Sequence, residues 1–288
     1  MQAHLFEAPS GNAETLVISY YPLVGNHGNT GPRYEREATL TNFDILGIIR
    51  QGSDTLTYSP DLRQKLSPGQ FDDYWTSKSD FLADYAYGYD RVIVRGQSVG
   101  AFPALSIVKK GVVKATHLVI DDGINTRKNR RGTQRHALTA GADWAISKRR
   151  ETKAQPDPLD PAWRIPAAPE GKDGLKKFAI ETLHWGALWR SDYGQSTLLE
   201  IASTRPDLPM LVSFVGHTAM TTNLEVETLR SRLALARLAR QKKSHTLNAD
   251  LRANYHTDAW HNILEYPEFG AKNLLEAAAM TSYVHITT

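Results

Sequence analysis

The chain has 288 residues, enough for one large α/β domain or two smaller ones, and a chain of this length buries roughly three quarters of its unfolded surface. Its 34 Lys and Arg residues nearly balance 31 Asp and Glu residues, and the resulting net charge of +3 excludes a globally basic nucleic-acid-binding protein. The absence of cysteine excludes disulfides, thiolate zinc sites and a cysteine nucleophile.

The N-terminal residues lack the basic and apolar segments of a secretory signal, and no stretch of ~18 apolar residues predicts a membrane span. On these grounds we expect a cytoplasmic protein. No phosphate-binding loop or dinucleotide-binding pattern occurs, so the sequence predicts no nucleotide cofactor. It leaves a homo-oligomeric state open.

Short apolar segments alternate with helical patterns over the first 125 residues, and turn residues separate them. The pattern predicts strands at residues 15–20, 43–49, 91–94 and 118–120. It also predicts a breaker-rich loop at 22–31 and helices at 77–87 and 101–109, the second of which ends at Gly111. This order favours βαβ units, in which a mostly parallel central sheet carries helices on both faces.

The composition changes between about residue 125 and residue 206. Five basic residues fall between Arg127 and Arg135, and a predicted helical region farther along carries Trp185 and Trp189. These tryptophans fit the lining of an apolar acyl or alkyl pocket, and ordinary packing against a core explains them equally well.

The sheet pattern returns after this region, with strands predicted at 209–215 and near 246–254 and helices at 223–242 and 268–280. We therefore expect an α/β core made of residues 1–122 and 207–288. A helical lid or cap at residues 123–206 is expected to interrupt it.

Gly96, Ser98 and Gly100 form a Gly-x-Ser-x-Gly pattern between the strand at 91–94 and the helix at 101–109. A serine at a sharp strand-to-helix turn is held in a strained backbone, with its Oγ above the edge of the sheet. Glycines two residues before and after it allow the backbone to approach closely, and the helix N-terminus faces a developing oxyanion. The pattern predicts a nucleophilic serine; the alternative is a tight turn with an incidental serine.

The segment YDRVIVRGQSVG at 89–100 resembles the strand and nucleophile elbow of the α/β-hydrolase family. Residues 43–53 are similar to the strand and glycine loop that precede this elbow, and the insertion after Ile120 resembles the family's lid. The segment WHNILEYPEF at 260–269 resembles the one that holds the family's histidine. The resemblance implies an esterase- or lipase-like serine hydrolase with a catalytic triad, which cleaves small-molecule acyl compounds through an acyl-serine intermediate.

His261 in that segment is the expected general base, because the serine-before-histidine order fits the family. His256, five residues earlier, is the alternative base. No metal site is expected from these histidines, since their spacing matches no common ligand pattern.

The acid is where the sequence departs from the family. Ala219 stands where the family has an aspartate after the strand at 209–215. Asp121 and Asp122 follow the strand at 118–120, and we prefer Asp122 because the C-terminal end of a parallel strand points at the site. Glu225 or Glu227, at the start of the next helix, is the alternative acid.

The oxyanion hole is expected to use the N–H of Val99 and a second N–H from the loop after the first strand. The family's His-Gly pair is absent from that loop, and Pro22 has no N–H. Tyr21 and Leu23 are therefore the candidate donors.

The missing aspartate and His-Gly pair also favour a second class of function, a non-catalytic α/β-hydrolase-like binding or interaction protein. A third class would bind nucleic acid through the basic run Arg127–Arg135. No aromatic residues lie among those charges, so a solvated lid segment is the preferred interpretation and no nucleic-acid partner is expected.

Overall fold

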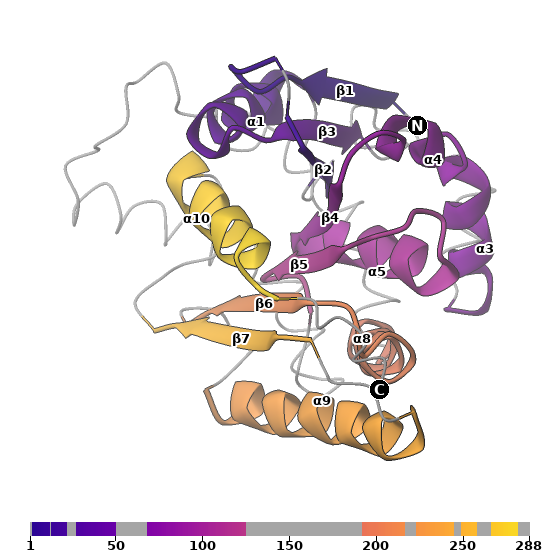
Figure 1. Ribbon diagram of the computed structural model, residues 1–288. Coiled ribbons are helices and arrows are strands. Elements are labelled where there is room, and N and C mark those ends of the chain that lie inside the picture. Colours follow the sequence, from indigo (N-terminus) through magenta and orange to yellow (C-terminus); the bar gives the residue numbers. More distant parts are fainter. Residues whose placement is uncertain are drawn as a thin grey trace, which may run out of the picture.

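A seven-stranded sheet forms the middle of the molecule (Figure 1). The computed structural model describes residues 2–11, 13–21, 27–49, 68–124, 192–216, 223–244, 249–257 and 266–281. The strands follow the spatial order β1 (Gln2–Phe6), β3 (Asp44–Ile49), β2 (Thr15–Tyr20), β4 (Arg91–Gln97), β5 (His117–Asp121), β6 (Met210–Val215) and β7 (Leu251–His256). Only the pair β1 and β3 is antiparallel, which confirms the predicted, mostly parallel α/β sheet.

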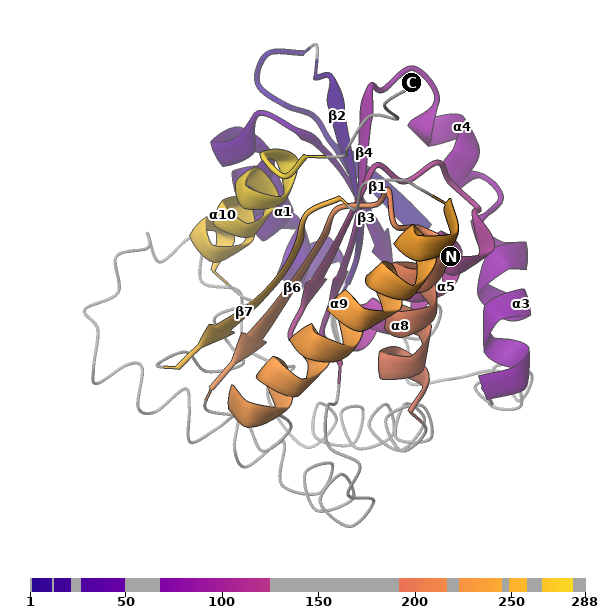
Figure 2. The same cartoon turned by 60° about the horizontal axis from the view of Figure 1, so that its bottom comes forward.

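Helices cover both faces of this sheet, as Figure 2 shows. One face carries α1 (His27–Thr41) and α10 (Pro267–Ala278). The other carries α3 (Pro68–Ser79), α5 (Ala101–Lys110), α8 (Tyr193–Thr204) and α9 (Asn223–Ser244), and the short helix α4 (Leu82–Ala86) follows α3. None of the helices within the described ranges combines the length and apolar character needed to cross a bilayer.

Alternate residues of the central strands supply two separate hydrophobic clusters. On β4, Val92 and Val94 join the large cluster on the α5 face, whereas Ile93 joins the smaller cluster on the α1 and α10 face. All three are almost completely buried, because a parallel sheet covered on both faces exposes neither side. The apolar run that predicted this strand therefore reflects burial on two faces.

The structure differs from the sequence-based prediction at α1. Breakers through Gly31 predicted a loop, yet α1 begins at His27 and contains Pro32. Tyr34 and Ala38, which lie farther along the helix, are fully buried in the cluster beneath it. Burial of an amphipathic face stabilises a helix more than local propensity opposes it, so packing determines this element.

Two further elements were predicted wrongly. The single helix expected at 77–87 is divided, since α3 ends at Ser79 and α4 begins at Leu82. The edge strand β1 was missed, because its sequence QAHLF has no clear alternation and gains its strand pairing only from β3.

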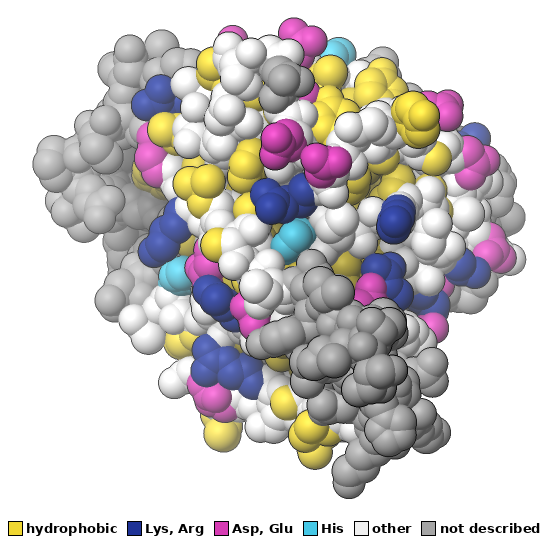
Figure 3. Space-filling model, viewed as in Figure 1, with side chains coloured by type: hydrophobic (Ala, Val, Ile, Leu, Met, Phe, Trp, Pro, Cys, Tyr) yellow, Lys and Arg dark blue, Asp and Glu magenta, His cyan; other side chains and the backbone are white. Residues whose placement is uncertain are grey.

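Most of the predicted lid lies outside the described residues. Residues 125–191, with the basic run 127–135 and both tryptophans, belong to that part. At the end of the predicted segment, α8 buries Leu198 and Ile201 completely in the large cluster. Over the described part of the face drawn in Figure 3, acidic and basic side chains are interspersed, with hydrophobic side chains between them.

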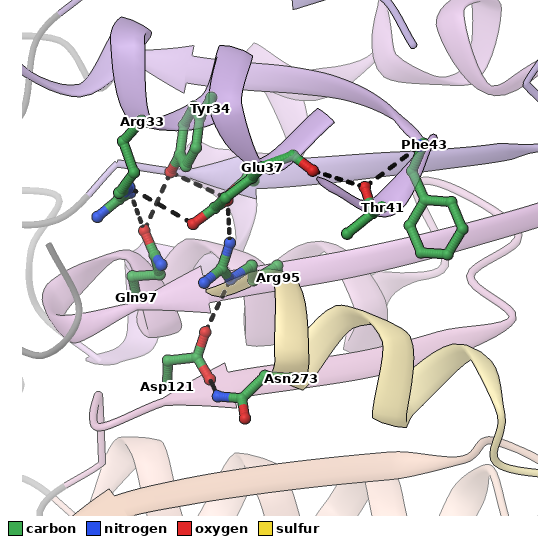
Figure 4. A network of polar contacts seen from close by, with 10 residues as sticks. Arg33, Tyr34, Glu37, Thr41, Phe43, Arg95, Gln97, Asp121 and Asn273 are labelled. Atoms are coloured by element: carbon green, nitrogen blue, oxygen red, sulfur yellow. Dashed lines mark hydrogen bonds and ion pairs between the residues drawn. The ribbon is translucent and has the colours of Figure 1, made fainter. Parts of the chain in front are cut away.

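A buried polar network occupies the α1 and α10 face of the sheet (Figure 4). Arg95 of β4 donates from Nη1 to Glu37 Oε2 of α1 at 2.6 Å and from Nε to Asp121 Oδ2 of β5 at 2.7 Å. Asn273 of α10 donates to the second oxygen of Asp121 at 2.8 Å, and Arg33 lies 3.6 Å from Glu37. The four charged side chains are at most 1% exposed, so the network joins two strands to two helices entirely inside the protein.

Gly270 allows α10 to approach this network. A Cβ atom at Gly270 would lie 1.9 Å from Glu37 Oε1 and 2.7 Å from Arg95 Nη2. Any other residue at this position would therefore displace a buried ion pair.

We expect Gly270→Ala to lower the free energy of unfolding by about 1–3 kcal/mol, because the added methyl group overpacks the contact with Glu37. Gly194→Ala in α8 is the matched control, since its Cβ would meet no atom closer than 3.3 Å. This control should change stability by less than about 1 kcal/mol. Urea unfolding of both variants measures the difference, and equal stabilities would contradict the tight packing at Gly270.

Candidate active site

Ser98 lies at a sharp turn between a strand and a helix. Strand β4 ends at Gln97, a 3₁₀ turn covers Ser98–Gly100, and α5 begins at Ala101. The backbone φ of Ser98 is 51°, in the left-handed region that residues other than glycine rarely adopt. Ser98 therefore has the strained backbone that the Gly-x-Ser-x-Gly pattern predicts.

The two glycines of the pattern are required by close backbone contacts. A Cβ atom at Gly96 would lie 2.5 Å from Ala101 Cα, and one at Gly100 would lie 2.5 Å from the carbonyl oxygen of Tyr20. The contact at Gly96 allows the tight turn from β4 into α5. The contact at Gly100 allows this turn to pack against the end of β2. The spacing in the sequence thus has a direct steric cause.

Asp122 lies at the end of β5 and is 2% exposed. Its φ of 46° is also in the left-handed region. Its backbone N–H donates to the carbonyl oxygen of Ser213 at 2.8 Å, and its Oδ1 accepts the N–H of Val215 at 3.3 Å. A Cβ atom at the next residue, Gly123, would lie 2.4 Å from the carbonyl oxygen of Ser98, so the segment that bears Asp122 packs directly on the serine turn.

The segments expected to hold Ala219 and His261 follow strands that end at the same edge of the sheet as β4 and β5. Strands β4 to β7 are parallel, so their C-terminal ends meet at one edge. Gly216 after β6 donates its N–H to the carbonyl oxygen of His256 at 2.8 Å, and its Cβ would lie 2.5 Å from the oxygen of Thr257. The segments with Ala219 and His261 begin at these adjacent points, and both residues lie outside the described part of the chain.

His256 is half-buried at the end of β7, and its ring contacts Phe269 edge-on with centroids 5.1 Å apart. Its Nε2 is buried and has no hydrogen-bond partner among the described residues. Burial lowers the pKa of His256 below 6.5 and the charge of Lys272 lowers it further, whereas Asp121, Glu276 and Asp122 oppose this shift. Burial therefore favours the neutral form of this imidazole.

The other candidates have differing environments. Glu225 is partly exposed in the first turn of α9. Val99, whose N–H directly follows Ser98, is completely buried in the turn. The N–H of Tyr21 donates to the carbonyl oxygen of Ile48 at 3.2 Å, so it continues the sheet, and Leu23 lies outside the described residues.

The charged residues beneath the serine turn were not predicted from the sequence. Arg95 follows Ile93 on the same face of β4, and Ile93 is buried there among apolar residues. A charged residue in phase with a buried position of a central strand was the available signal, because such a charge needs a buried partner. The sequence did not identify that partner.

Comparison with known proteins identifies the fold. No protein-family model and no curated protein matches the sequence. The structure is similar to MenH from S. aureus (TM-score 0.55, 13% identity, covering 96% of this chain and 98% of that one). It is also similar to a lipase-esterase related protein from Clostridium acetobutylicum (TM-score 0.56, 10% identity, covering 96% of this chain and 99% of that one). A protein from Desulfitobacterium hafniense assigned to the alpha/beta hydrolase family is similar as well (TM-score 0.54, 16% identity, covering 96% of this chain and 99% of that one). The chain therefore has the α/β-hydrolase fold that its segment 89–100 predicts.

Because the pKa of His256 is lowered in the folded protein, the unfolded chain binds a proton at this residue more readily. The free energy of unfolding should therefore fall as the pH drops below 6.5. His117, buried at the start of β5, has its pKa lowered chiefly by burial and should contribute in the same direction. NMR titration of the imidazole protons measures each pKa separately, and a value at or above 6.5 for His256 would contradict its neutral state.

Proposed function

We propose that this chain is a serine hydrolase that cleaves an ester or related acyl bond of a small molecule through an acyl-serine intermediate at Ser98. The observation that carries the proposal is the left-handed φ of 51° at Ser98, between the end of β4 and the start of α5. A serine in such a turn presents its Oγ beside the N-terminus of a helix, whose partial positive charge stabilises an oxyanion. The α/β-hydrolase fold supports the same class of reaction.

In the proposed first step, Ser98 Oγ attacks the acyl carbonyl carbon while His261 accepts the hydroxyl proton. The N–H of Val99 and a second N–H from the loop after β2 stabilise the oxyanion that forms. Leu23 is the preferred second donor, because the N–H of Tyr21 is already bonded to Ile48. The tetrahedral intermediate then breaks its bond to the leaving oxygen, which takes the proton from His261 and departs as an alcohol.

A water molecule completes the proposed cycle. His261 takes a proton from this water as it attacks the acyl-serine, and the second tetrahedral intermediate releases the acid and restores Ser98. The reaction needs no cofactor. His256 is the alternative base for both steps, and its lowered pKa favours the neutral form that a base requires.

Asp122 is proposed as the acid that orients His261. Its burial, its position at the end of β5 and the packing of Gly123 on Ser98 support this role. A carboxylate accepts several hydrogen bonds at once, so Asp122 can hold the N–H of Val215 with Oδ1 and also accept the imidazole Nδ1–H. Glu225 is the alternative acid, on the other side of the segment that contains Ala219.

Labelling with a fluorophosphonate probe tests the nucleophile. The native protein should form a covalent adduct at Ser98, located by mass spectrometry of peptides, because the probe reacts with an activated serine. Ser98→Ala should abolish the adduct, while Ser106→Ala in the middle of α5 is a control that should retain it. An unlabelled native protein would instead favour the non-catalytic binding protein.

Two isosteric substitutions identify the acid. Asp122→Asn should leave the fold intact but favour the wrong tautomer of His261, with a loss approaching about 10⁴-fold in turnover of p-nitrophenyl acetate. Glu225→Gln should be nearly silent. The opposite pattern would assign the acid to Glu225, and two silent variants would contradict a triad.

A further inference from the structure

The buried network around Arg95 contains four charges that cancel. Arg33 and Arg95 are positive, Glu37 and Asp121 are negative, and all four lie on the α1 and α10 face of the sheet. Removing this many charges from water is costly, and well-packed apolar residues of similar volume usually stabilise a fold as well or better. Stability alone therefore does not account for the network.

The network lies immediately beneath the candidate site, in positions set by the register of the strands. Gln97, the residue before Ser98, pairs with Asp121, the residue before Asp122. Arg95 pairs on its other side with Ser19, the residue before the end of β2. The strand ends that bear the proposed nucleophile and acid therefore meet within the network.

The side chain of Gln97 links the C-terminal end of β4 to α1 through hydrogen bonds. Its Oε1 accepts hydrogen bonds from Arg33 Nη2 and from the hydroxyl of Tyr34, the latter at 3.2 Å. Tyr34 in turn accepts a hydrogen bond from Ser19 Oγ at 2.9 Å. Figure 4 shows Arg33 and Tyr34 converging on Gln97 from the helix. The last residue before the strained Ser98 is thus held by its side chain as well as by the sheet.

The two helices of this face connect the network to the rest of the proposed machinery. Helix α1 follows residues 22–26 in the chain, which include the proposed donor Leu23, and it supplies Arg33, Tyr34 and Glu37. Helix α10 follows the segment that contains His261 and supplies Asn273, which donates to Asp121. A shift of either helix would be transmitted to the ends of β4 and β5.

We propose that Arg33, Tyr34, Glu37, Arg95, Gln97 and Asp121 form a positioning network for acyl transfer, which fixes the Ser98 turn relative to Asp122. Gln97 is the contact through which the network acts on Ser98. This inference rests on the proposed hydrolase function. It assigns these residues an indirect role, since none of them is required to touch the substrate.

The test measures how fast Ser98 reacts with a fluorophosphonate, separated into the maximal rate kinact and the half-saturating concentration KI. Gln97→Leu removes both acceptor contacts at nearly constant volume. It should lower kinact by about 10- to 100-fold, because small displacements of reacting groups have effects of this size. KI should change by less than about twofold, because the probe itself contacts none of the altered atoms.

Two further variants separate positioning from a general loss of stability. Gln97→Glu keeps acceptor oxygens for Arg33 and Tyr34 but adds a buried negative charge to the neutral cluster, so it should restore kinact only in part. Tyr34→Phe, which removes a single hydroxyl, should lower kinact by a smaller factor of about 3- to 10-fold. If Gln97→Leu does not fold, the kinact of Tyr34→Phe tests the positioning role in its place.

Tyr89→Phe is the matched control. The Tyr89 hydroxyl donates to Asp44 Oδ2 at 2.6 Å, next to the start of β4 and thus at the opposite end of that strand from Ser98. This variant should lose a comparable hydrogen bond and some stability in urea, yet it should keep the native kinact. Equal effects of Tyr34→Phe and Tyr89→Phe would overturn the positioning role.

The remaining outcomes distinguish this inference from the function on which it rests. Native kinact in both Gln97→Leu and Tyr34→Phe, or a rise in KI alone, would overturn the network's role and leave Ser98 as the nucleophile. An unlabelled native protein would overturn the hydrolase function, and the positioning role with it.

Discussion

The buried guanidinium of Arg95 is the constraint on which the arrangement of this face depends. A fully buried positive charge requires nearby carboxylates, and Arg95 meets one from α1 and one from β5. Removing one partner of such a pair generally costs about 3–5 kcal/mol, because the other charge remains buried. Helix α1 must therefore lie where Glu37 reaches Arg95. Helix α10 must have a residue without a side chain, Gly270, where it packs against the Glu37 carboxylate.

A second constraint acts at the ends of the two neighbouring strands. Ser98 after β4 and Asp122 after β5 both have left-handed φ values, each of which costs of order 1–3 kcal/mol for a residue other than glycine. Such strain persists only where the surroundings determine the conformation. Gly100 lets the turn at Ser98 pack against the backbone of Tyr20, and Gly123 lets the turn at Asp122 pack against the backbone of Ser98. The two strained turns are therefore in direct contact.

The parts of the structure that could be predicted from the sequence depend on local patterns. Each of these patterns is complete within a few residues of the sequence. They are the apolar run at Val92–Val94, the glycines around Ser98 and the helix cap at Gly111, whose φ is 67°. The network has only one local signal, the charge of Arg95 in phase with buried Ile93, and its pairing is not local, since Arg95 meets Glu37 across 58 residues and Asn273 meets Asp121 across 152. Helix α1 was missed for the same reason: its breakers are local, whereas the burial of Tyr34 that outweighs them comes from distant strands.

The position of the network along the strands explains how the fold tolerates so many buried polar groups. On the α1 and α10 face, the middle positions of β2, β4 and β5 are apolar, with Val17, Ile93 and Val119, and the next positions on that face are polar, with Ser19, Arg95 and Asp121. The opposite face of the same strands contributes only to the large apolar cluster. Hydrophobic burial therefore stabilises the sheet across one face and in the middle of the other. Thr15 and His117 are buried polar residues at the starting ends of β2 and β5. The ion pairs of Arg95 lie at the opposite end, where β4 and β5 enter their strained turns, so that these directional contacts occur where the geometry must be most closely defined.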